Sequence, residues 1–451
     1  MKNKVLTGLL LVLIGGWGNL LAQNAGSNYA RQVNTLIGTK GVGLTSGYLY
    51  PGATYPYGMV QFTPSYFSKR SGFVINQLSG GGCEHMGNFP TFPVKGKLKM
   101  SPDNILNYRI NISEEKGHAG YYEAMVQEDI KAKLTVTERT GMASYEYPAD
   151  QQYGTVIIGG GISATPIEQA AIVITAPNKC EGYAEGGNFC GLRTPYKVYF
   201  VAEFDADALE SGTWKRDELK PNTTFAEGEY SGVYFTFDVS KKKNVQYKIG
   251  VSYVSVENAR ENLKAENTGW DFLQIQNQAE SKWNHYLGKI EVEGTNPDRA
   301  TQFYTHLYRS FIHPNVCSDV NGEYMGADFR VHKSRSKHYT SFSNWDTYRT
   351  QIQLLSMLDP EVASDIVISH QLFAEEAGGA FPRWVMANIE TGVMQGDPTP
   401  ILISNAYAFG ARNYDPKPIF KIMRKGAEEP GAMSQDVEAR PGLKQYLDKG
   451  Y

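Results

Sequence analysis

Hydrophobic and polar side chains alternate with a period of two along the first half of the chain. In the segment 130–136, Ile130, Ala132, Leu134 and Val136 alternate with lysine and threonine residues. Because successive side chains of a strand point to opposite faces of a sheet, this alternation predicts strands with one buried face. Similar segments, separated by Gly, Pro, Asn and Lys, lie at 196–204, 233–239 and 245–256. They predict an antiparallel β-sandwich over residues 23–257.

The period changes near Glu257. Apolar residues now recur every three or four positions, at Phe272, Ile275, Ala279, Trp283 and Leu287. This spacing lines up one apolar stripe on a helix, so residues 258–296 are predicted to form a helical linker.

Helical patterns continue through the second half of the chain. Asn296 followed by Pro297 is typical of a helix N-cap with proline at the first helical position. Further helical patterns lie at 345–358, 360–373 and 398–411. Residues 313–343, dense in polar and aromatic residues, predict a long functional loop. We therefore predict an α+β protein of several domains, with the first part of a helical domain over residues 297–451.

The first 22 residues have the layout of a secretory signal peptide. Lys2 and Lys4 precede an apolar run at 5–14, and the segment closes with Leu20-Leu21-Ala22 before Gln23. The strongly apolar core is shorter than the roughly 20 residues that a membrane-spanning helix needs. We expect cleavage near Ala22, no membrane span after cleavage, and a periplasmic or secreted protein.

Charge excludes one class of partner. The chain of 451 residues has 44 Lys plus Arg and 47 Asp plus Glu, a net charge of −3. Proteins that bind nucleic acid usually carry a basic stripe that neutralises phosphates, and no such stripe is present. We expect no nucleic-acid partner.

Four cysteines remain for an oxidising compartment: Cys83, Cys180, Cys190 and Cys317. The spacing permits a disulfide between Cys180 and Cys190 across a glycine-rich segment, and buried free thiols are the alternative. Cys83 and Cys317 are expected to be free thiols. No pair has the spacing of a structural zinc site, and no HExxH pattern is present, so no metal ligands are predicted from spacing.

The segment 343–349 reads Ser-Asn-Trp-Asp-Thr-Tyr-Arg. Trp345 offers an apolar surface for a sugar ring, while Asp346 and Arg349 offer an acceptor and donors for hydroxyls. The alternative is an aspartate in a first helical turn with a nearby arginine partner. Both interpretations fit the residues.

Two further clusters have open interpretations. Glu84 and His85 follow three glycines at 80–82 and are either polar groups at a binding site or part of a plain turn. Residues 383–398 contain Arg383, Trp384, Glu390 and Asp397, which either point into one cavity or, for Asp397 before a proline, cap a helix. There is no G-x-S-x-G elbow of a serine hydrolase.

Several segments together resemble the family-92 glycoside hydrolases, exported calcium-dependent exo-α-mannosidases. The most specific are 33–39 (VNTLIGT), 50–61 (YPGATYPYGMVQ) and the Ser-x-Trp-Asp-Thr-x-Arg motif at 343–349. Further matches lie at 120–122, 134–147, 283–294, 303–326 and 339–349. The resemblance runs over almost the whole chain after residue 22.

The resemblance implies a β-sandwich packed on an (α/α)6 barrel, with a mannose site between them. It implies that Asp346 binds the hydroxyls of a terminal mannose and that Trp345 and Arg349 shape the same pocket. It also places Glu84 and His85 where the sandwich domain approaches that pocket. It also implies a mannose-containing glycan as substrate, α-1,2 linkage, inversion and a calcium cofactor.

The resemblance further implies that the chain stops inside the barrel. The general acid, the general base and the calcium ligands are then expected beyond residue 451, and no catalytic pair is assigned. Two alternatives remain open. One is a catalytically silent carbohydrate-binding protein of the same architecture. The other is a different glycosidase or a disaccharide phosphorylase that combines a β-sandwich with an (α/α)6 barrel.

Overall fold

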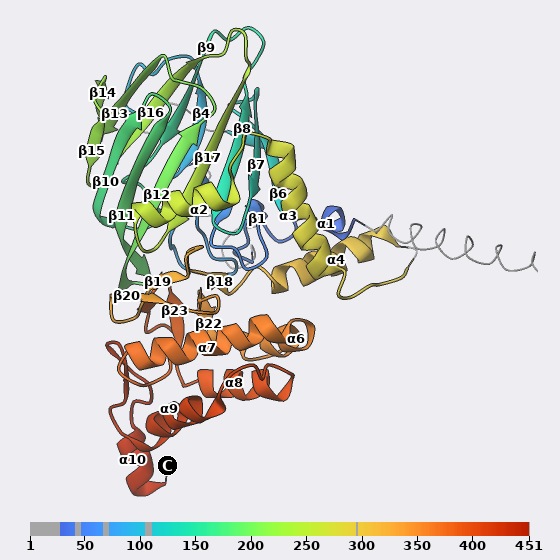
Figure 1. The fold of residues 1–451 in the computed structure, drawn as a ribbon, viewed down its shortest axis with the longest axis vertical. Helices are drawn as coiled ribbons and strands as arrows, with labels where there is room; N and C mark the ends of the chain where they lie inside the picture. The colour runs from blue at the N-terminus through green and yellow to red at the C-terminus, as the bar shows by residue number, and fades with distance from the viewer. Residues whose placement is uncertain (1–27, 41–46, 66–71, 104–110, 295, 451) are drawn as a thin grey trace, which may run out of the picture.

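The structure is a computed structural model that describes residues 28–40, 47–65, 72–103, 111–294 and 296–450 (Figure 1). The predicted signal peptide lies outside the described residues. A β-rich upper part is joined to a lower layer of helices, with α3 and α4 at one side of the junction (Figure 1).

Two antiparallel sheets form the upper part. The first has the order β1-β2-β3-β4-β9-β16-β13-β14. Its strands are β1 Ala53–Thr54, β2 Gln61–Pro64, β3 Phe73–Val74, β4 Thr91–Lys95, β9 Tyr153–Ile158, β16 Ser231–Asp238, β13 Glu210–Lys215 and β14 Glu218–Pro221.

The second sheet has the order β15-β10-β11-β12-β17-β8-β7-β6-β5. Its strands are β15 Phe225–Glu227, β10 Ile167–Ala176, β11 Lys179–Phe189, β12 Leu192–Phe204, β17 Asn244–Ser252, β8 Thr140–Glu146, β7 Ile130–Val136, β6 Tyr121–Val126 and β5 Ile112–His118. The two sheets pack face to face, since Phe204 of β12 lies 4.8 Å from Phe235 of β16 between ring centroids.

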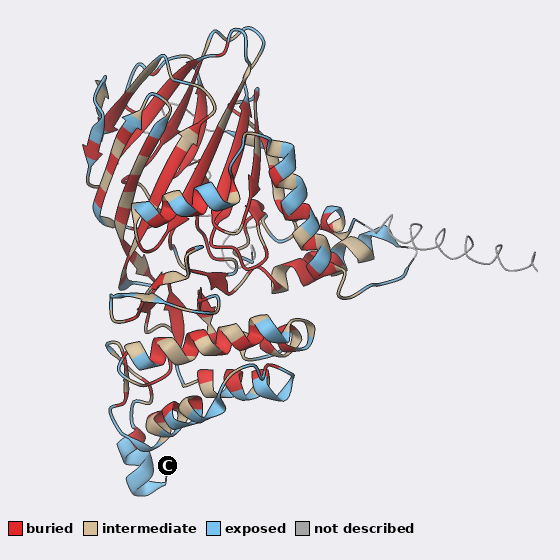
Figure 2. Ribbon diagram, in the orientation of Figure 1, coloured by how far each residue is buried: buried red, intermediate tan, exposed pale blue. Residues whose placement is uncertain are grey.

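The period-two segments became strands of this sandwich, as predicted. In β7 the four apolar positions are buried, and the two lysines between them are partly exposed to solvent (Figure 2). The predicted segment 245–256 is too long, because β17 ends at Ser252 and Ser255 caps the next helix. The Ser255 side chain accepts a hydrogen bond from the amide of Asn258, which fixes that boundary.

The helices follow the sandwich, apart from the short α1 at Tyr29–Gln32. They are α2 Val256–Glu266, α3 Phe272–Leu287, α4 Pro297–Ser310, α5 Asn344–Thr347, α6 Gln351–Leu358, α7 Pro360–Glu376, α8 Thr399–Ala408, α9 Pro416–Glu428 and α10 Leu443–Lys449. Short strands join them: β18 Asn315–Val316, β19 Glu323–Met325, β20 Val331–Lys333, β21 Tyr339–Thr340, β22 Phe342–Ser343, β23 Trp384–Met386, β24 Ile389–Glu390, β25 Met433–Ser434 and β26 Val437–Glu438.

The predicted helices at 272–287, 297 onwards, 360–373 and 398–411 are present, with ends that differ by a few residues. The Asn296 side chain caps α4, as its sequence indicates. The single helix predicted at 345–358 is wrong. It is broken into α5 and α6 because Thr350 has a φ of +65°, a left-handed conformation that a helix cannot include.

Helices α3 and α4 pack directly on the sandwich. The indole nitrogen of Trp283, in α3, donates a 2.7 Å hydrogen bond to the carbonyl of Thr54 in β1. The hydroxyl of Tyr308, in α4, lies 2.7 Å from the hydroxyl of Thr54. Both aromatic side chains are fully buried, so the helical domain is anchored at the β1 end of the sandwich.

The predicted cysteine pairing is wrong. Cys83 is bonded to Cys190, whereas Cys180 and Cys317 are buried free thiols. Cys180 lies in β11 with its side chain in the sandwich core, and Cys190 lies in the turn that follows that strand. The strand separates these two thiols, while the fold brings the turn against the glycine-rich loop that ends at Cys83.

Two surface features follow from the fold. In the described part of the chain, no helix is both long and apolar enough to cross a membrane. Large apolar side chains are exposed on three neighbouring helices: Met357 of α6, Ile401 and Tyr407 of α8, and Phe420 of α9.

Candidate functional site

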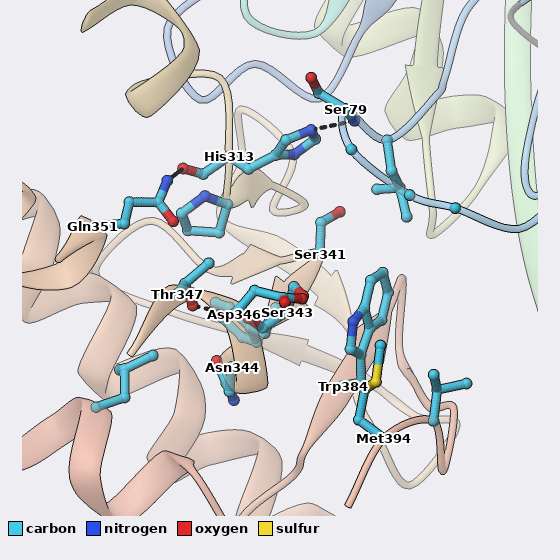
Figure 3. A pocket seen from close by; sticks show the side chains of 18 of the residues that line it. Ser79, His313, Ser341, Ser343, Asn344, Asp346, Thr347, Gln351, Trp384 and Met394 are labelled. Atoms are coloured by element: carbon cyan, nitrogen blue, oxygen red, sulfur yellow. Dashed lines mark hydrogen bonds between the residues drawn. The ribbon is translucent and has the colours of Figure 1, made fainter. Parts of the chain in front are cut away.

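A cavity of about 480 Å³ lies between the sandwich and the helical domain (Figure 3). Its volume is within the range of small-molecule binding sites. One wall comes from the sandwich, through the loop 78–83 and the turn 189–190. The other wall comes from the helical domain, through residues around β22, α5, α6 and α7.

Asp346 is the one carboxylate among the described residues that line this cavity. It lies in α5, and its carboxylate accepts a hydrogen bond from the Ser343 hydroxyl. The next residue in the helix, Thr347, also lines the cavity. The carboxyl group is exposed, so its oxygens are available to accept further hydrogen bonds from a polar ligand.

A buried polar residue of α5 fixes the position of this helix against α7 and α8. The amide of Asn344 donates a 2.7 Å hydrogen bond to the Thr399 hydroxyl at the start of α8. Its carbonyl oxygen lies 3.1 Å from Nε2 of His370 in α7. Asn344 is 1% exposed, so these contacts hold the helix that carries Asp346 against two other helices.

The strand pairing next to α5 places an aromatic side chain at the cavity. Ser343 of β22 pairs with Trp384 of β23, which places the indole beside the cavity (Figure 3). The indole packs against Phe189 of the sandwich, with 4.5 Å between ring centroids. Trp384 thus contributes an apolar surface at the boundary of the two domains.

The sandwich wall is tied in three places. The disulfide joins Cys83 to Cys190, and both residues line the cavity. The backbone amide of Leu78 donates a 2.9 Å hydrogen bond to Nε2 of His85. The backbone amide of Ser79 donates a 2.8 Å hydrogen bond to Nε2 of His313 (Figure 3). The loop 78–83 is therefore held in one conformation.

The two histidines act as acceptors because they are neutral. Burial lowers the pKa of His85 to about 4, and burial also lowers the pKa of His313 to about 4. A neutral ring has one nitrogen free to accept, and in both cases this nitrogen, Nε2, faces a backbone amide of the loop. The remaining Nδ1 of His313 donates to Asn315 over 2.7 Å.

Two residues that line the cavity have unusual backbone conformations. Ser341 has a φ of +62° and Met394 a φ of +68°. Non-glycine residues in this region cost about 1–3 kcal/mol each and concentrate at functional sites. Their position on this cavity supports its assignment as the site.

The five residues predicted from the sequence are not all at the cavity. Asp346 lines it, whereas Trp345 and Arg349 are exposed and point elsewhere. The Arg349 guanidinium donates to the neighbouring Tyr348 hydroxyl over 2.6 Å. Glu84 is exposed outside the cavity, and His85 lies buried behind the loop that forms the wall.

The cluster at 383–398 does not form one cavity wall. Arg383 donates to the carbonyls of Met394 and Gly396, and Glu390 accepts backbone amides of its own hairpin. Burial raises the pKa of the Glu390 carboxyl. Asp397 pairs with Arg440 at 2.9 Å, and α8 has no side-chain cap, so the N-cap interpretation of Asp397 is wrong.

His313 was not predicted as a residue of the cavity. It lies in the polar and aromatic stretch that was predicted to be functional, but nothing in its spacing identifies it. Of the four residues of the 383–398 cluster that could point into one cavity, Trp384 alone lines it. Its role depends on the pairing of β22 with β23, between residues about 40 positions apart, which the pattern of neither segment reveals.

A calcium ion does not fit the described residues of the cavity. Calcium takes six to eight oxygen ligands, usually with several carboxylates, and Asp346 is the one carboxylate on the described cavity walls. No role in binding or hydrolysis is therefore assigned to calcium at this cavity.

Two family models together match most of the chain. Residues 32–252 match the glycosyl hydrolase family 92 N-terminal domain, and residues 258–451 match the glycosyl hydrolase family 92 catalytic domain. The chain belongs to glycosyl hydrolase family 92. The boundary between the matches lies between β17 and α2, where the sandwich ends.

Solved family 92 structures share the fold. A family GH92 alpha-mannosidase from Bacteroides thetaiotaomicron is 24% identical, with a TM-score of 0.83, over 93% of this chain and 59% of that one. An inverting family GH92 mannosidase from the same organism is also 24% identical, with a TM-score of 0.80, over 94% of this chain and 58% of that one. The β-sandwich followed by a helical domain is thereby confirmed.

A curated relative gives a similar coverage. An uncharacterized secreted glycosidase from Arthroderma benhamiae is 25% identical over 93% of this chain and 55% of its own length. The family 92 chain described here therefore spans a little over half of the length of the relatives that it matches.

Proposed function

We propose that the protein is an exo-acting α-mannosidase that removes terminal mannose from glycans with inversion, with a preference for α-1,2 linkages. The observation that carries the proposal is the placement of Asp346. It is the sole carboxylate on the described walls of a cavity between the two domains, and Trp384 lies beside it. Membership of family 92 supports mannose as the sugar, since one family structure was solved in complex with mannoimidazole.

In this proposal, Asp346 accepts hydrogen bonds from two hydroxyls of the terminal mannose. The Ser343 hydroxyl orients the carboxylate, and Trp384 covers an apolar face of the ring. The sandwich loop 78–83 limits how far the rest of the glycan extends, so its rigidity favours an exo-acting enzyme. A periplasmic or secreted location is part of the proposal, supported by the secreted relative.

One observation favours a second candidate function. Inverting hydrolysis needs two carboxyl groups about 6.5–9.5 Å apart, one as acid and one as base. The described walls of the cavity offer Asp346 alone. A carbohydrate-binding protein without hydrolysis therefore fits the described residues as well.

Calorimetry with mannose and release of mannose from an α-1,2-linked mannobiose test these proposals together. We expect Asp346→Asn to weaken mannose binding at least tenfold, because one charged acceptor is lost, which costs about 1.5–3 kcal/mol. Asp448→Asn, an exposed aspartate of α10, is the matched control and should bind as the wild type.

Equal binding by the wild type and Asp346→Asn contradicts the sugar site. Binding without release of mannose favours the second candidate over hydrolysis by this chain. Release that Asp346→Asn abolishes supports the mannosidase.

A further inference from the structure

A second cluster of polar side chains lies outside the cavity, where the β19–β20 hairpin meets α7 (Figure 1). It consists of Asp328 in the turn of the hairpin, His332 in β20 and Glu376, the last residue of α7. We propose that these three residues bind one divalent metal ion of the zinc type, which joins the hairpin to the helix.

The ligand atoms are close enough for one ion. One oxygen or nitrogen of each residue lies within 4.8 Å of the other two. Nε2 of His332 is 2.9 Å from Oδ1 of Asp328. Ligands at about 2.1 Å around a tetrahedral zinc ion lie about 3.4 Å apart, so small rotations of these side chains reach that arrangement.

The three side chains pack closely against the backbone of Gly326. A β-carbon placed on Gly326 would lie 2.5 Å from Cδ2 of His332, 2.7 Å from Oδ1 of Asp328 and 2.8 Å from Oε2 of Glu376. These distances are shorter than van der Waals contact, so any side chain at position 326 would displace the imidazole and both carboxylates.

No lysine or arginine side chain forms a direct ion pair with the carboxylates of the cluster among the described residues. The ion-pair partner of Asp328 is His332. Two carboxylates that face one another this closely repel each other unless a cation lies between them. A divalent ion would supply that charge.

Residues around the cluster hold the ligands in place. The Tyr324 hydroxyl donates a 2.6 Å hydrogen bond to Oε1 of Glu376, and the amide of Ala327 donates over 3.0 Å to its Oε2. The amide of Arg330 donates over 3.1 Å to Asp328. Such outer contacts orient metal ligands in proteins.

The donor set selects the class of metal. One imidazole nitrogen and two carboxylate oxygens suit zinc and similar divalent ions, whereas calcium prefers six to eight oxygens. The side chains of His332 and Asp328 are 35% and 26% exposed, so an ion can enter from solvent and water can complete its coordination. The three residues are spread over 49 positions of the chain, which is why spacing in the sequence gave no sign of them.

Titration of the chelator-treated protein with zinc chloride, followed by calorimetry, tests the site. We expect one equivalent of zinc to bind and the melting temperature to rise with zinc. His332→Ala should weaken binding at least tenfold. Gly326→Ala keeps all three ligands but its methyl group would push them apart, and it should weaken binding by at least as much. His306→Ala, an exposed histidine of α4, is the matched control.

Circular dichroism in chelator shows whether each variant is folded, and Asp328→Asn, which preserves the shape of the side chain, replaces any variant that is not. Three results overturn the proposal: no saturable binding by the wild type, equal binding by wild type and both site variants, or a stronger affinity for calcium than for zinc. None of these readouts depends on glycosidase activity.

Discussion

The two walls of the cavity are built in different ways. The sandwich wall is a loop without regular structure that is fixed by a disulfide and by two neutral histidines. The helical wall is a single helical turn, α5, that carries the carboxylate and is fixed by packing of Asn344 against α7 and α8. The first wall is held by a crosslink and by buried imidazoles, and the second presents the carboxyl group of Asp346 to the cavity. Stability and ligand binding should therefore respond to different substitutions.

Loss of the disulfide should have the largest effect on stability. Cys83 and Cys190 are separated by 107 residues, and a crosslink over a loop of that length stabilises by about 5 kcal/mol through the entropy of the unfolded chain. We expect the double variant Cys83→Ser, Cys190→Ser to lower the free energy of unfolding in urea by about this amount. A reductant should lower the free energy of unfolding of the wild type by a similar amount and leave that of the double variant unchanged. A wild type whose stability does not change in reductant would show that the disulfide does not fix the sandwich wall.

Acid should weaken the same wall next. The folded pKa of His85 is about 4, below the ordinary value of 6.5, so the folded state favours the neutral ring. Stability from this group is complete above pH 6.5 and falls as pH decreases toward 4, by about 3 kcal/mol. Urea denaturation at several pH values should show this loss, and His85→Gln should flatten the curve.

His313 titrates in the same range and adds its own slope to that curve. His306→Gln, at an exposed position of α4, is the control that should leave the curve unchanged. A wild-type stability that is constant between pH 6.5 and 4 would mean that the loop is not held by neutral histidines.

The helical wall contains a strained position whose relief has a smaller effect. Thr350 has a φ of +65° between α5 and α6, a conformation that costs a β-branched residue about 1–2 kcal/mol. Thr350→Gly should raise the free energy of unfolding by about 1 kcal/mol. Met357→Gly, an exposed residue inside α6, should lower it by about 1 kcal/mol, and equal effects of both variants would contradict the assigned break in the helix.

The smallest effect is expected for Trp345, next to Asp346 in sequence. Its side chain is 45% exposed and lies outside the cavity, so Trp345→Ala should change stability by less than about 0.5 kcal/mol and mannose affinity by less than twofold. Trp384→Ala, at the cavity, should weaken mannose binding severalfold. A larger effect at Trp345 than at Trp384 in calorimetry would reverse the assignment of the aromatic surface.

Much of the fold could be predicted from local patterns. The alternation in β7 and the stripe on α3 each identify an element and its buried face, because burial of a face depends on the period of the side chains alone. The motif at 343–349 likewise identified Asp346. The same motif also suggested Trp345 and Arg349, which do not line the cavity. Trp345 lies one position before Asp346 in the same helical turn and so points in another direction, and Arg349 lies beyond the end of α5.

The sequence by itself determined the two-part architecture, the order of strands followed by helices, and one carboxylate that lines the cavity. Only the tertiary structure decided that Cys83 pairs with Cys190, that Trp384 rather than Trp345 lines the cavity, and that Asp328, His332 and Glu376 lie close together. The reason is that periodicity reports how a segment meets its immediate surroundings. Contacts between distant segments depend on sheet pairing and helix packing, which no single segment encodes.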